Sequence, residues 1–462
     1  MMTKWNGKRV LILGGARQGQ AAARYLARHG AVVTINDRRP ADEMKTTCSA
    51  LGDVAVTWVL GDHPLALLDA TDCVCLSGGI PLTLPIVVEA IRRGIHLTND
   101  TQLFLEACPG RTVGITGSAG KTTTTTLVGR IAQKGIPAGS KKVYTGGNIG
   151  DPLLNHVDEM SSDDLAVLEI SSFQLEQMTL APTMAAILNI TPNHLDRHGT
   201  MQAYIAAKVR ILEYQNPEDI AILGRDDPVA AGLKGRVKGR LLTFGLTPLP
   251  AGDFGTFSDA GRYLLRSEQG DVLLFDETCV HLRGDHNRQN ILAASAIASA
   301  VGISAEVIRA EVNAFHGVAH RLEHVRKLRG ADWYNDSIAT APERTIAAIR
   351  SFTEPLVLLL GGRDKNLPWE HLAAIVHERI DHVVVFGEAA EKILIALGKP
   401  SPNRRPHSLV RCDGLREAVQ AAADVATEGD IVLLSPGGTS FDQFQDFEQR
   451  GEEFRKWVSE LT

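Results

Sequence analysis

A glycine-rich loop between a strand-like run and a helix-like run constrains the fold of this chain more than any other feature. Val113 to Thr116 are typical of a buried strand. Gly117 and Gly120 follow, and the loop ends in Lys121-Thr122. Glycines allow the tight turn, successive backbone N–H groups face inward, and the helix dipole attracts a polyphosphate. A strand, a loop and a helix in this order predict a parallel α/β domain with a nucleotide site.

The loop departs from the strict phosphate-binding pattern at two points. Ile115 stands where that pattern has a glycine, and Thr122 to Thr126 form a β-branched run of low helix propensity. Leu127 and Ile131 lie four residues apart and can hold the helix against its sheet. Packing and a ligand, rather than propensity, must therefore stabilise the first turns of this helix.

We expect the loop to bind the phosphates of a nucleoside triphosphate. Lys121 would reach the β- and γ-phosphates, and Thr122 would ligate Mg²⁺. The residues expected at the nucleotide are Gly114, Thr116, Gly117, Ser118, Ala119, Gly120, Lys121, Thr122 and Thr123.

Composition excludes several classes of protein. The chain has 462 residues, which is about three domains of about 150 residues each, and 44% of them are hydrophobic. A net charge of -6 provides no basic surface for a nucleic acid. The six cysteines are scattered and indicate neither a zinc site nor a disulfide framework. No apolar run approaches the ~20 residues of a membrane span, so we expect a cytoplasmic protein with small-molecule partners and no membrane contact.

Alternating strand-like and helix-like runs predict three α/β domains, at residues 1–107, 108–317 and 318–462. The first and third are expected to be Rossmann-like. The central domain is expected to resemble phosphate-loop ATPases, with a mostly parallel sheet and a small antiparallel sheet from residues 220–285. Further strands are predicted at residues 73–76, 165–170, 185–190, 357–360, 383–386 and 431–434, and a helix at residues 287–301.

A second glycine loop, Gly14 to Gly19, resembles the dinucleotide-binding pattern. Asp37 ends the next strand, where it could bind a ribose hydroxyl, but Ala16 replaces the glycine that lets the backbone approach a pyrophosphate. The pair Arg38-Arg39 suits an anion. Three interpretations stay open: a dehydrogenase, a plain strand-helix turn, and a loop for another nucleotide diphosphate, which the pattern favours.

Three further polar residues have the chemistry of metal-assisted phosphoryl transfer. Glu169 ends a predicted strand and could ligate Mg²⁺, and His194 follows the next strand. Lys208 lies in a helix-like segment. A loop histidine is more often a surface residue and a helix lysine is more often solvated. Two ligand candidates after adjacent strands nevertheless favour a metal site.

Nine motifs together resemble one known family. They are GITGSAGKT (114–122), LEISSFQLE (168–176), NITPNHLDRH (189–198), YIAAK (204–208), DHNRQN (285–290), AHRLE (319–323), NDSIAT (335–340), LGGRDKN (360–366) and SPGGTSFDQFQDFEQRG (435–451). In this order, across all three predicted domains, they resemble the Mur ligases of peptidoglycan synthesis. The resemblance implies ATP-dependent amide-bond formation, in which the carboxylate of UDP-N-acetylmuramoyl-L-alanine becomes an acyl phosphate and the amine of D-glutamate displaces the phosphate through a tetrahedral intermediate.

The resemblance also assigns roles around ATP and two Mg²⁺ ions. Thr122 and Glu169 match ligands of the first ion and His194 a ligand of the second. Lys208 matches a lysine that becomes carbamylated, which turns a cation into an anionic oxygen ligand. Asn290 matches an adenine contact, and Arg321 and Asp336 match residues of the third domain that bind ATP. Lys121, His194 and Lys208 are thus the expected catalytic residues.

Two further sets of residues are implied for the other substrates. The UDP-substrate set is Arg17, Gln18, Arg38, Gly79, Asn148 and His194, and the glutamate set is Thr340, Lys365, Ser440 and Phe447. Each set leaves plainer interpretations open. Asn148 could be only a turn residue, Thr340 could cap the helix before Pro342, and Phe447 could belong to the core.

Two departures and three rival functions stay open. Ala119 stands where many relatives have asparagine, and Ile338 stands where some have a lysine, so another cation must supply that charge or it is absent. The rivals are a nucleotide-binding module without turnover, a dehydrogenase, and a sibling ligase that adds another amino acid, such as L-glutamate. The spacing of motifs does not distinguish D- from L-glutamate. We expect a monomer.

Overall fold

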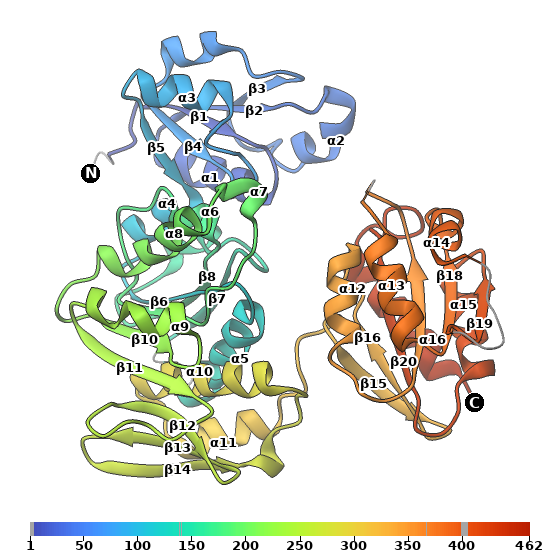
Figure 1. The fold of residues 1–462 in the computed structure, drawn as a ribbon. Coiled ribbons are helices and arrows are strands. Elements are labelled where there is room, and N and C mark those ends of the chain that lie inside the picture. The colour runs from blue at the N-terminus through green and yellow to red at the C-terminus, as the bar shows by residue number, and fades with distance from the viewer. Residues whose placement is uncertain (1–3, 138, 140, 366, 399–404) are drawn as a thin grey trace. The chain divides into compact units, whose positions relative to one another are not determined.

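The computed structural model describes residues 4–137, 139, 141–365, 367–398 and 405–462 (Figure 1). The chain forms two compact units. The first comprises residues 1–281 and 285–315, and the second comprises residues 282–284 and 316–462. Within the described ranges, no helix has both the length and the apolar character that crossing a membrane requires.

The first unit begins with a five-stranded parallel sheet in the order β3-β2-β1-β4-β5. Its central strands are apolar and nearly inaccessible, as strands covered on both faces must be. The strands are β1 Arg9–Leu13, β2 Val32–Asp37, β3 Val56–Leu60, β4 Cys73–Leu76 and β5 His96–Asn99. The helices are α1 Arg17–Arg28, α2 Ala41–Ser49, α3 Pro85–Arg92 and α4 Asp100–Ala107, with the 3₁₀ segment η1 Leu65–Ala70.

The same unit contains a nine-stranded sheet in the order β14-β13-β12-β11-β10-β9-β6-β8-β7. Only the β12–β13 and β13–β14 pairs are antiparallel. The predicted antiparallel strands are therefore present, but they continue the central sheet. The strands are β6 Arg111–Thr116, β7 Val143–Gly147, β8 Leu165–Glu169, β9 Met184–Ile187, β10 Ile220–Gly224, β11 Arg240–Gly245, β12 Gly255–Asp259, β13 Arg262–Ser267 and β14 Gly270–Asp276.

Seven α-helices accompany these strands in the described part of the unit: α5 Lys121–Gly135, α6 Ser172–Leu175, α7 Leu195–His198, α8 Met201–Glu213, α9 Pro228–Ala231, α10 Asp285–Val301 and α11 Ala305–Asn313. Helix α5 contains the threonine run. Leu127 and Ile131 are fully buried, as their spacing predicts, and the helix also buries Thr124 and Thr125. Packing thus stabilises a segment of low intrinsic helix propensity.

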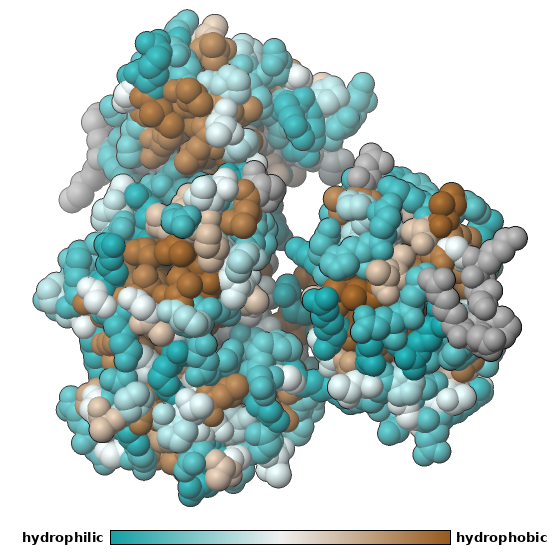
Figure 2. Space-filling view, in the orientation of Figure 1, coloured by the Kyte–Doolittle hydropathy of each residue, from teal (hydrophilic) through white to brown (hydrophobic). Residues whose placement is uncertain are grey.

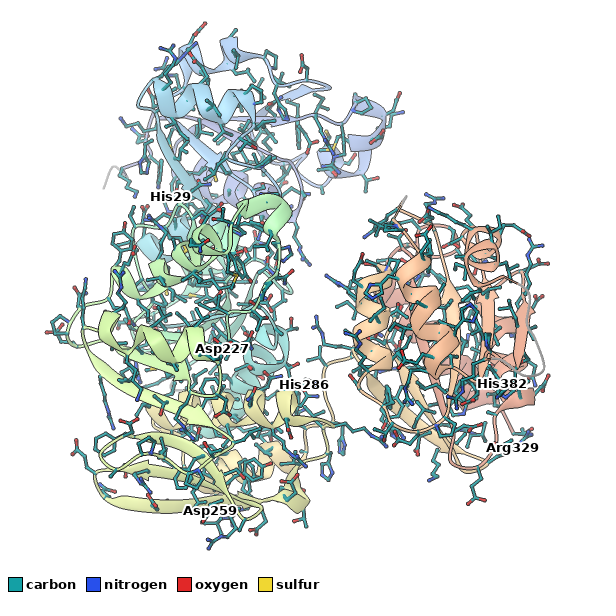
Figure 3. All side chains as sticks on the ribbon, viewed as in Figure 1. His29, Asp227, Asp259, His286, Arg329 and His382 are labelled. Atoms are coloured by element: carbon teal, nitrogen blue, oxygen red, sulfur yellow. The ribbon has the colours of Figure 1, made fainter. Side chains whose placement is uncertain are left out.

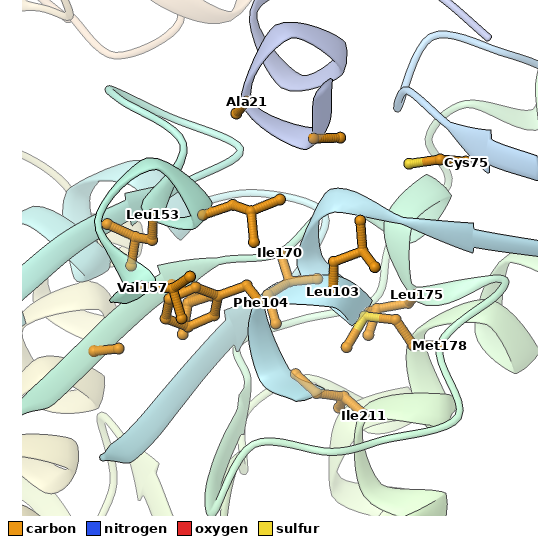
Figure 4. Packing of buried hydrophobic residues seen from close by; sticks show 14 of the residues in the cluster. Ala21, Cys75, Leu103, Phe104, Leu153, Val157, Ile170, Leu175, Met178 and Ile211 are labelled. Atoms are coloured by element: carbon orange, nitrogen blue, oxygen red, sulfur yellow. The ribbon is translucent and has the colours of Figure 1, made fainter. Parts of the chain in front are cut away.

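One hydrophobic core joins the two sheets of the first unit (Figure 4). Leu103 and Phe104 of α4 belong to it, together with Ile170 after β8 and Leu153. The alternation of strand-like and helix-like runs predicts a domain boundary at residue 107, directly after α4. The three-domain division stays a prediction, and this core shows that α4 packs against later residues as well as against its own sheet.

The surface of the first unit has an apolar area over α3, on the face visible in Figure 2. Val88 and Ile91 of this helix are each about half exposed, at 51% and 53%. Their neighbours Ile86, Val87 and Ala90 are fully buried. The helix therefore carries more apolar surface than its contact with the sheet requires.

The second unit contains a six-stranded sheet in the order β15-β16-β20-β17-β18-β19, with only the edge pair β15–β16 antiparallel. Separate hydrophobic clusters cover its two faces. The predicted strands near residues 357, 383 and 431 are confirmed. The strands are β15 Glu323–Leu328, β16 Ala331–Asn335, β17 Leu356–Gly361, β18 His382–Phe386, β19 Ser408–Arg411 and β20 Ile431–Gly437. The helices are α12 Pro342–Ile349, α13 Glu370–Arg379, α14 Ala390–Leu397, α15 Leu415–Val425 and α16 Phe447–Glu460.

Candidate active site

Five residues of the predicted UDP-substrate set line one cavity of about 630 Å³ in the first unit. They come from four segments that follow different strands: Arg17 and Gln18 after β1, Arg38 after β2, Gly79 after β4, and Asn148 after β7. Carboxyl ends of parallel strands are where open α/β sheets bind ligands. The sixth predicted residue, His194, does not line the cavity, whereas Arg197 of α7 does.

Hydrogen bonds between loops fix the floor of this cavity. The Ser77 hydroxyl donates to the Gly14 carbonyl at 2.8 Å, and the Gly78 N–H donates to the Gln18 side chain at 3.0 Å. Arg197 donates to the carbonyl of Gly79 at 3.1 Å. Sequence reasoning missed Arg197, although it lies in the motif that contains His194. Hydrogen bonds between the lining segments therefore define the shape of the cavity.

The carboxylate of Asp37 is hydrogen-bonded to the first glycine loop and to Arg39. It accepts from the Gly15 N–H at 2.9 Å, from the Arg39 N–H at 3.0 Å, and from the Arg39 guanidinium at 3.0 and 2.7 Å. Burial opposes ionisation, but these hydrogen bonds outweigh it and lower the pKa of Asp37 to about 2. These donors occupy the acceptor sites of the carboxylate. The possible contact of Asp37 with a ribose hydroxyl thus has no free acceptor in this arrangement.

The phosphate loop is held from both sides. Gly120 has a φ of 83°, and a Cβ at this position would lie 2.0 Å from Oδ1 of Asn290. The amide of Asn189 accepts from the Ala119 N–H at 2.9 Å and donates to the Ala119 carbonyl at 3.2 Å. Asn189 is a loop-supporting residue that sequence reasoning did not single out. Only glycine at position 120 satisfies both its backbone conformation and the contact with Asn290.

Gly114, which was expected at the nucleotide, lies inside β6 instead of in the loop. A Cβ there would lie 2.5 Å from Pro182 and 2.9 Å from Ile170. Its lack of a side chain is therefore explained by packing against neighbouring segments. The nucleotide contacts of the loop residues that follow stay predictions.

Two lysines converge on one carbonyl oxygen of the loop. Nζ of Lys121 and Nζ of Lys208 each donate to the Gly117 carbonyl at 2.9 Å. Lys208 is only 1% exposed and also lies 4.8 Å from the ring centroid of Tyr204. Burial, followed by the charge of Lys121, lowers the pKa of Lys208 well below its ordinary value. The plain interpretation of Lys208 as a solvated helix lysine is wrong.

Glu169 connects the phosphate loop with the cavity. Its carboxylate is 2% exposed and accepts from the Thr122 hydroxyl and from the Asn148 amide, both at 2.9 Å. In this turn, Gly147 and Gly150 have positive φ angles and Asn148 does not. The interpretation of Asn148 as only a left-handed turn residue is therefore not supported. A buried carboxylate beside a threonine hydroxyl is a ligand pair of the kind that Mg²⁺ prefers. The residues present thus fit a magnesium ion.

His194 lies on the segment between β9 and α8. It has a φ of 54°, is exposed, and packs its ring 5.1 Å from that of Phe173. Farther along, His198 bonds to the Ser172 hydroxyl at 2.9 Å, and Asp227 (Figure 3) accepts from the Ile190 N–H at 3.2 Å. Among the described residues, no three His, Cys, Asp or Glu side chains form a metal-binding group. The role of His194 as a ligand stays a prediction.

In the second unit, the loops that carry the predicted glutamate set are bonded to one another. Gly437 donates its N–H to the Ala339 carbonyl at 2.9 Å, and Arg363 and Thr439 exchange backbone hydrogen bonds of 2.7 and 2.9 Å. These loops follow β16, β17 and β20 and carry Thr340, Lys365 and Ser440, respectively. The structure therefore brings three of the four predicted residues to one edge of the sheet.

The plainer interpretations of two glutamate-set residues are not supported. Helix α12 has Ala341 as its N-cap, so Thr340 does not cap it. Phe447 begins α16 and accepts at its carbonyl from the Ser337 hydroxyl at 2.8 Å, whereas Phe444 packs against the core.

Asp336, expected at ATP, is a buried carboxyl group. It accepts from the Ser435 hydroxyl at 2.9 Å and from the Leu322 N–H at 3.2 Å. Burial raises the pKa of Asp336 to about 7 against the effect of these bonds and of Arg321. Arg321 precedes β15 in the same unit. Their contacts with ATP stay predictions.

Two arginines of the second unit were missed by sequence reasoning. Arg450 is fully buried and donates to the Ser337 hydroxyl and carbonyl at 2.9 and 2.8 Å and to the Gly438 carbonyl at 3.1 Å. Arg344 donates to the carbonyl of Ile338 at 3.2 Å, and after burial its charge is the next cause of the lowered pKa of Lys365. Arg344 thus places a cation beside Ile338, the position for which the family resemblance implied a lysine.

Three consecutive segments match known protein families. Residues 8–99 match the family described as Mur ligase MurD-like, N-terminal domain. Residues 115–298 match the Mur ligase middle domain, and residues 320–438 match the Mur ligase, glutamate ligase domain. Together these segments cover well over half of the chain.

Curated relatives extend the similarity to the whole length. The UDP-N-acetylmuramoylalanine–D-glutamate ligase of Koribacter versatilis is 39% identical over 457 residues, which are 99% of this chain and 98% of that protein. The ligase of the same name from Symbiobacterium thermophilum is 37% identical over 460 residues, 98% of each chain.

Solved structures extend the similarity to the fold. MurF of Acinetobacter baumannii has a TM-score of 0.57 at 19% identity and covers 98% of this chain and 94% of its own. The UDP-N-acetylmuramate-alanine ligase MurC of Thermotoga maritima has a TM-score of 0.56 at 17% identity and covers 98% and 100%. At these identities the likeness concerns the fold alone.

Proposed function

Because the chain belongs to the Mur ligase family, we propose that it is an ATP-dependent ligase that adds D-glutamate to UDP-N-acetylmuramoyl-L-alanine. The reaction forms an amide bond in a peptidoglycan precursor and releases ADP and phosphate. A carboxylate is a poor electrophile, so it first takes the γ-phosphoryl group of ATP as an acyl phosphate. The amine of D-glutamate then attacks, and a tetrahedral intermediate expels phosphate.

The contacts of Asn148 are the observation that supports this proposal most directly. Asn148 lines the cavity that collects the predicted UDP-substrate residues, and its amide holds the buried carboxylate of Glu169. Glu169 in turn accepts from Thr122, the residue that follows the phosphate-loop lysine. A substrate in the cavity thus has its reacting end beside the groups that handle phosphate. Phosphoryl transfer to a bound carboxylate requires this adjacency.

Within this proposal, Lys121 and the N–H groups at the start of α5 hold the phosphates of ATP. Thr122 and Glu169 hold one Mg²⁺, and His194 with carbamylated Lys208 holds a second. Bound magnesium offsets the charge that accumulates when one anion attacks another. Tyr204 keeps water from the Lys208 side chain, and Asn189 fixes the loop backbone, so both pre-organise the site.

A carbamate on Lys208 is chemically reasonable in this environment. CO₂ adds only to a neutral amine, and burial together with Lys121 lowers the pKa of Lys208 and so favours the neutral form. The amine loses a proton as the N–C bond forms, and the product is an anionic oxygen ligand. The resulting negative charge lies beside the cation of Lys121, which stabilises it.

The remaining assignments concern ATP, glutamate and the setting of the enzyme. We assign Asn290, Arg321 and Asp336 to ATP, and Thr340, Lys365, Ser440 and Phe447 to D-glutamate. We further propose domains at residues 1–107, 108–317 and 318–462, and a cytoplasmic monomer. Small-angle scattering at several protein concentrations tests the monomer.

Phosphate release tests the function. Purified protein is supplied with ATP, Mg²⁺ and UDP-N-acetylmuramoyl-L-alanine, and release is compared for D-Glu, L-Glu, D-Asp and L-Lys. D-Glu is expected to give the highest kcat/KM. Release only with L-Glu or another amino acid would indicate a sibling ligase, and no release above the amino-acid-free blank with any of them would contradict ligase activity.

The carbamate has its own test, which does not depend on turnover. Protein equilibrated with ¹³C-labelled bicarbonate is expected to show a carbamate carbon resonance that Lys208→Ala lacks and Lys234→Ala retains. Lys208→Ala is also expected to lose most activity and to regain part of it with short carboxylic acids. A spectrum identical for all three proteins would contradict the carbamate.

A further inference from the structure

His63 lines the cavity of the first unit, but the sequence motifs gave it no role. It follows β3 in a loop bonded to the end of β2, where the Gly61 N–H donates to the Asp37 carbonyl at 3.0 Å. In sheets of this topology, a pyrophosphate lies at the N-terminus of the first helix, and the nucleoside extends toward the end of the second strand. His63 thus lies on the nucleoside side of the cavity.

The hydrogen-bonding role of the His63 ring is fixed by a buried neighbour. Asn36 is fully buried, and its NH₂ group donates to the carbonyls of Val59 at 2.8 Å and Asp62 at 2.7 Å. Its Oδ1 therefore remains as the acceptor that faces Nδ1 of His63 at 2.5 Å. Because an amide oxygen only accepts, Nδ1 must carry the proton. In the neutral imidazole, Nε2 is then an acceptor on the opposite side of the ring.

Nε2 of His63 adds an acceptor to a cavity whose charged side chains mainly donate. Arg17, Arg38 and Arg197 line the cavity, and guanidinium groups only donate. The nearby carboxylate of Asp37 is occupied by Gly15 and Arg39. Arginines suit the phosphates, whereas uridine also presents donors, namely its imide N3–H and its ribose hydroxyls.

We propose that His63 is a specificity-determining residue for the nucleoside of the substrate, and that its Nε2 accepts a hydrogen bond from the uracil N3–H or from the ribose 2′-hydroxyl. This inference rests on the proposed function, because it takes the ligand to be a uridine diphosphate. Asn36 is the positioning residue that holds the ring in the accepting tautomer. Both candidate donors belong to one ligand, so the same experiment distinguishes them.

Calorimetric titration of the full-length protein with UDP, 3-methyl-UDP and 2′-deoxy-UDP tests the proposal without turnover. His63→Ala removes the acceptor, and His63→Gln offers an amide oxygen in its place. His96→Ala is the matched control, because His96 is an exposed histidine at the opposite end of the same sheet. Thermal unfolding midpoints establish that all variants are folded.

His63→Ala is expected to bind UDP about tenfold more weakly than the wild type, with His63→Gln between them and His96→Ala unchanged. The analogue that lacks the contacted donor should lose about tenfold in the wild type and nothing further in His63→Ala. Loss with 3-methyl-UDP assigns the imide, and loss with 2′-deoxy-UDP assigns the ribose.

Equal UDP affinity in wild type and His63→Ala, or the same analogue penalties in both, would overturn the role of His63 and leave the proposed function intact. Wild-type protein that does not bind UDP at all would overturn both. UDP binding that depends on His63 in a protein without glutamate-dependent phosphate release would overturn only the proposed function.

Discussion

The two glycine loops of the first unit are built for different tasks, although both join a parallel strand to a helix. The loop after β6 is surrounded by its own partners: Lys121 and Lys208 meet on the Gly117 carbonyl, and Asn189 binds the backbone of Ala119. The loop after β1 instead forms one wall of an open cavity whose other walls come from distant segments. One short segment of sequence can supply most of the contacts of a phosphate site. A site for a larger substrate needs side chains from several segments that are far apart in the sequence.

The largest effect on activity is expected from a substitution in the phosphate loop. Lys121→Ala removes the cation that we propose for the terminal phosphates, and kcat is expected to fall about 10³-fold. UDP binding to the cavity should be unchanged in calorimetry. Lys134→Ala, in the last turn of the same helix, is the control and should retain activity. A Lys121→Ala enzyme within tenfold of the wild type would contradict the phosphate role of the loop.

A change at Asn148 tests whether the two sites are coupled. Asn148→Ala removes the amide that holds Glu169 and also alters the cavity wall, so activity is expected to fall about 10- to 100-fold. KM for UDP-N-acetylmuramoyl-L-alanine and the Mg²⁺ requirement should both rise. Asn155→Ala, at the nearby exposed Asp151 contact, is the matched control. A rise in one of these parameters alone would separate the two sites.

A charge removed from the cavity should affect binding rather than chemistry. Arg38→Gln is expected to raise KM for the UDP substrate about tenfold and to leave kcat unchanged, because in the proposed function this guanidinium binds the UDP substrate equally before and during the reaction. The difference should shrink at high salt. Arg92→Gln, an exposed arginine of α3, serves as control. A fall in kcat with unchanged KM would contradict a binding role for Arg38.

The smallest expected effect concerns stability. The pKa of Asp37 is lowered to about 2 in the folded protein from an ordinary 3.8, so its contribution is present above about pH 4 and is lost as pH falls through about 2. Asp37→Asn should therefore lower stability by about 1 kcal/mol at pH 7, after allowance for solvent screening. Urea unfolding midpoints measured at pH 7 and pH 3 check this. A deficit that grows on acidification would contradict the assignment.

Much of the fold could be predicted from sequence because strand runs such as Val357 to Leu360 are continuous and apolar. The strands near residues 73, 165, 357, 383 and 431 are found where they were expected. The antiparallel strands expected in the central domain are present, and the pairing of β11 with β12 makes them continuous with the parallel sheet, which the sequence did not predict. Pairing between strands depends on contacts that local patterns do not encode.

Some residues of the candidate site could likewise be predicted from the sequence, and others could not. Lys121 and Thr122 follow from one short motif, and the resemblance to a family pointed to Lys208, which the structure buries beside them. Arg197, His63 and Arg450 were not predicted. Each is an ordinary polar residue in the sequence, and each has a hydrogen-bond partner at least 27 positions away that the sequence alone does not reveal, such as Asn36 for His63.

The sequence by itself determined the class of fold, the phosphate loop and the family, because glycine spacing and apolar periodicity act over a few neighbouring residues. Only the tertiary structure decided that Lys208 is buried against a second lysine and that Asn148 joins cavity to carboxylate. It also decided that Asn36 leaves one nitrogen of His63 free to accept. These properties arise from burial and from hydrogen bonds between distant segments, so they exist only once the chain has folded.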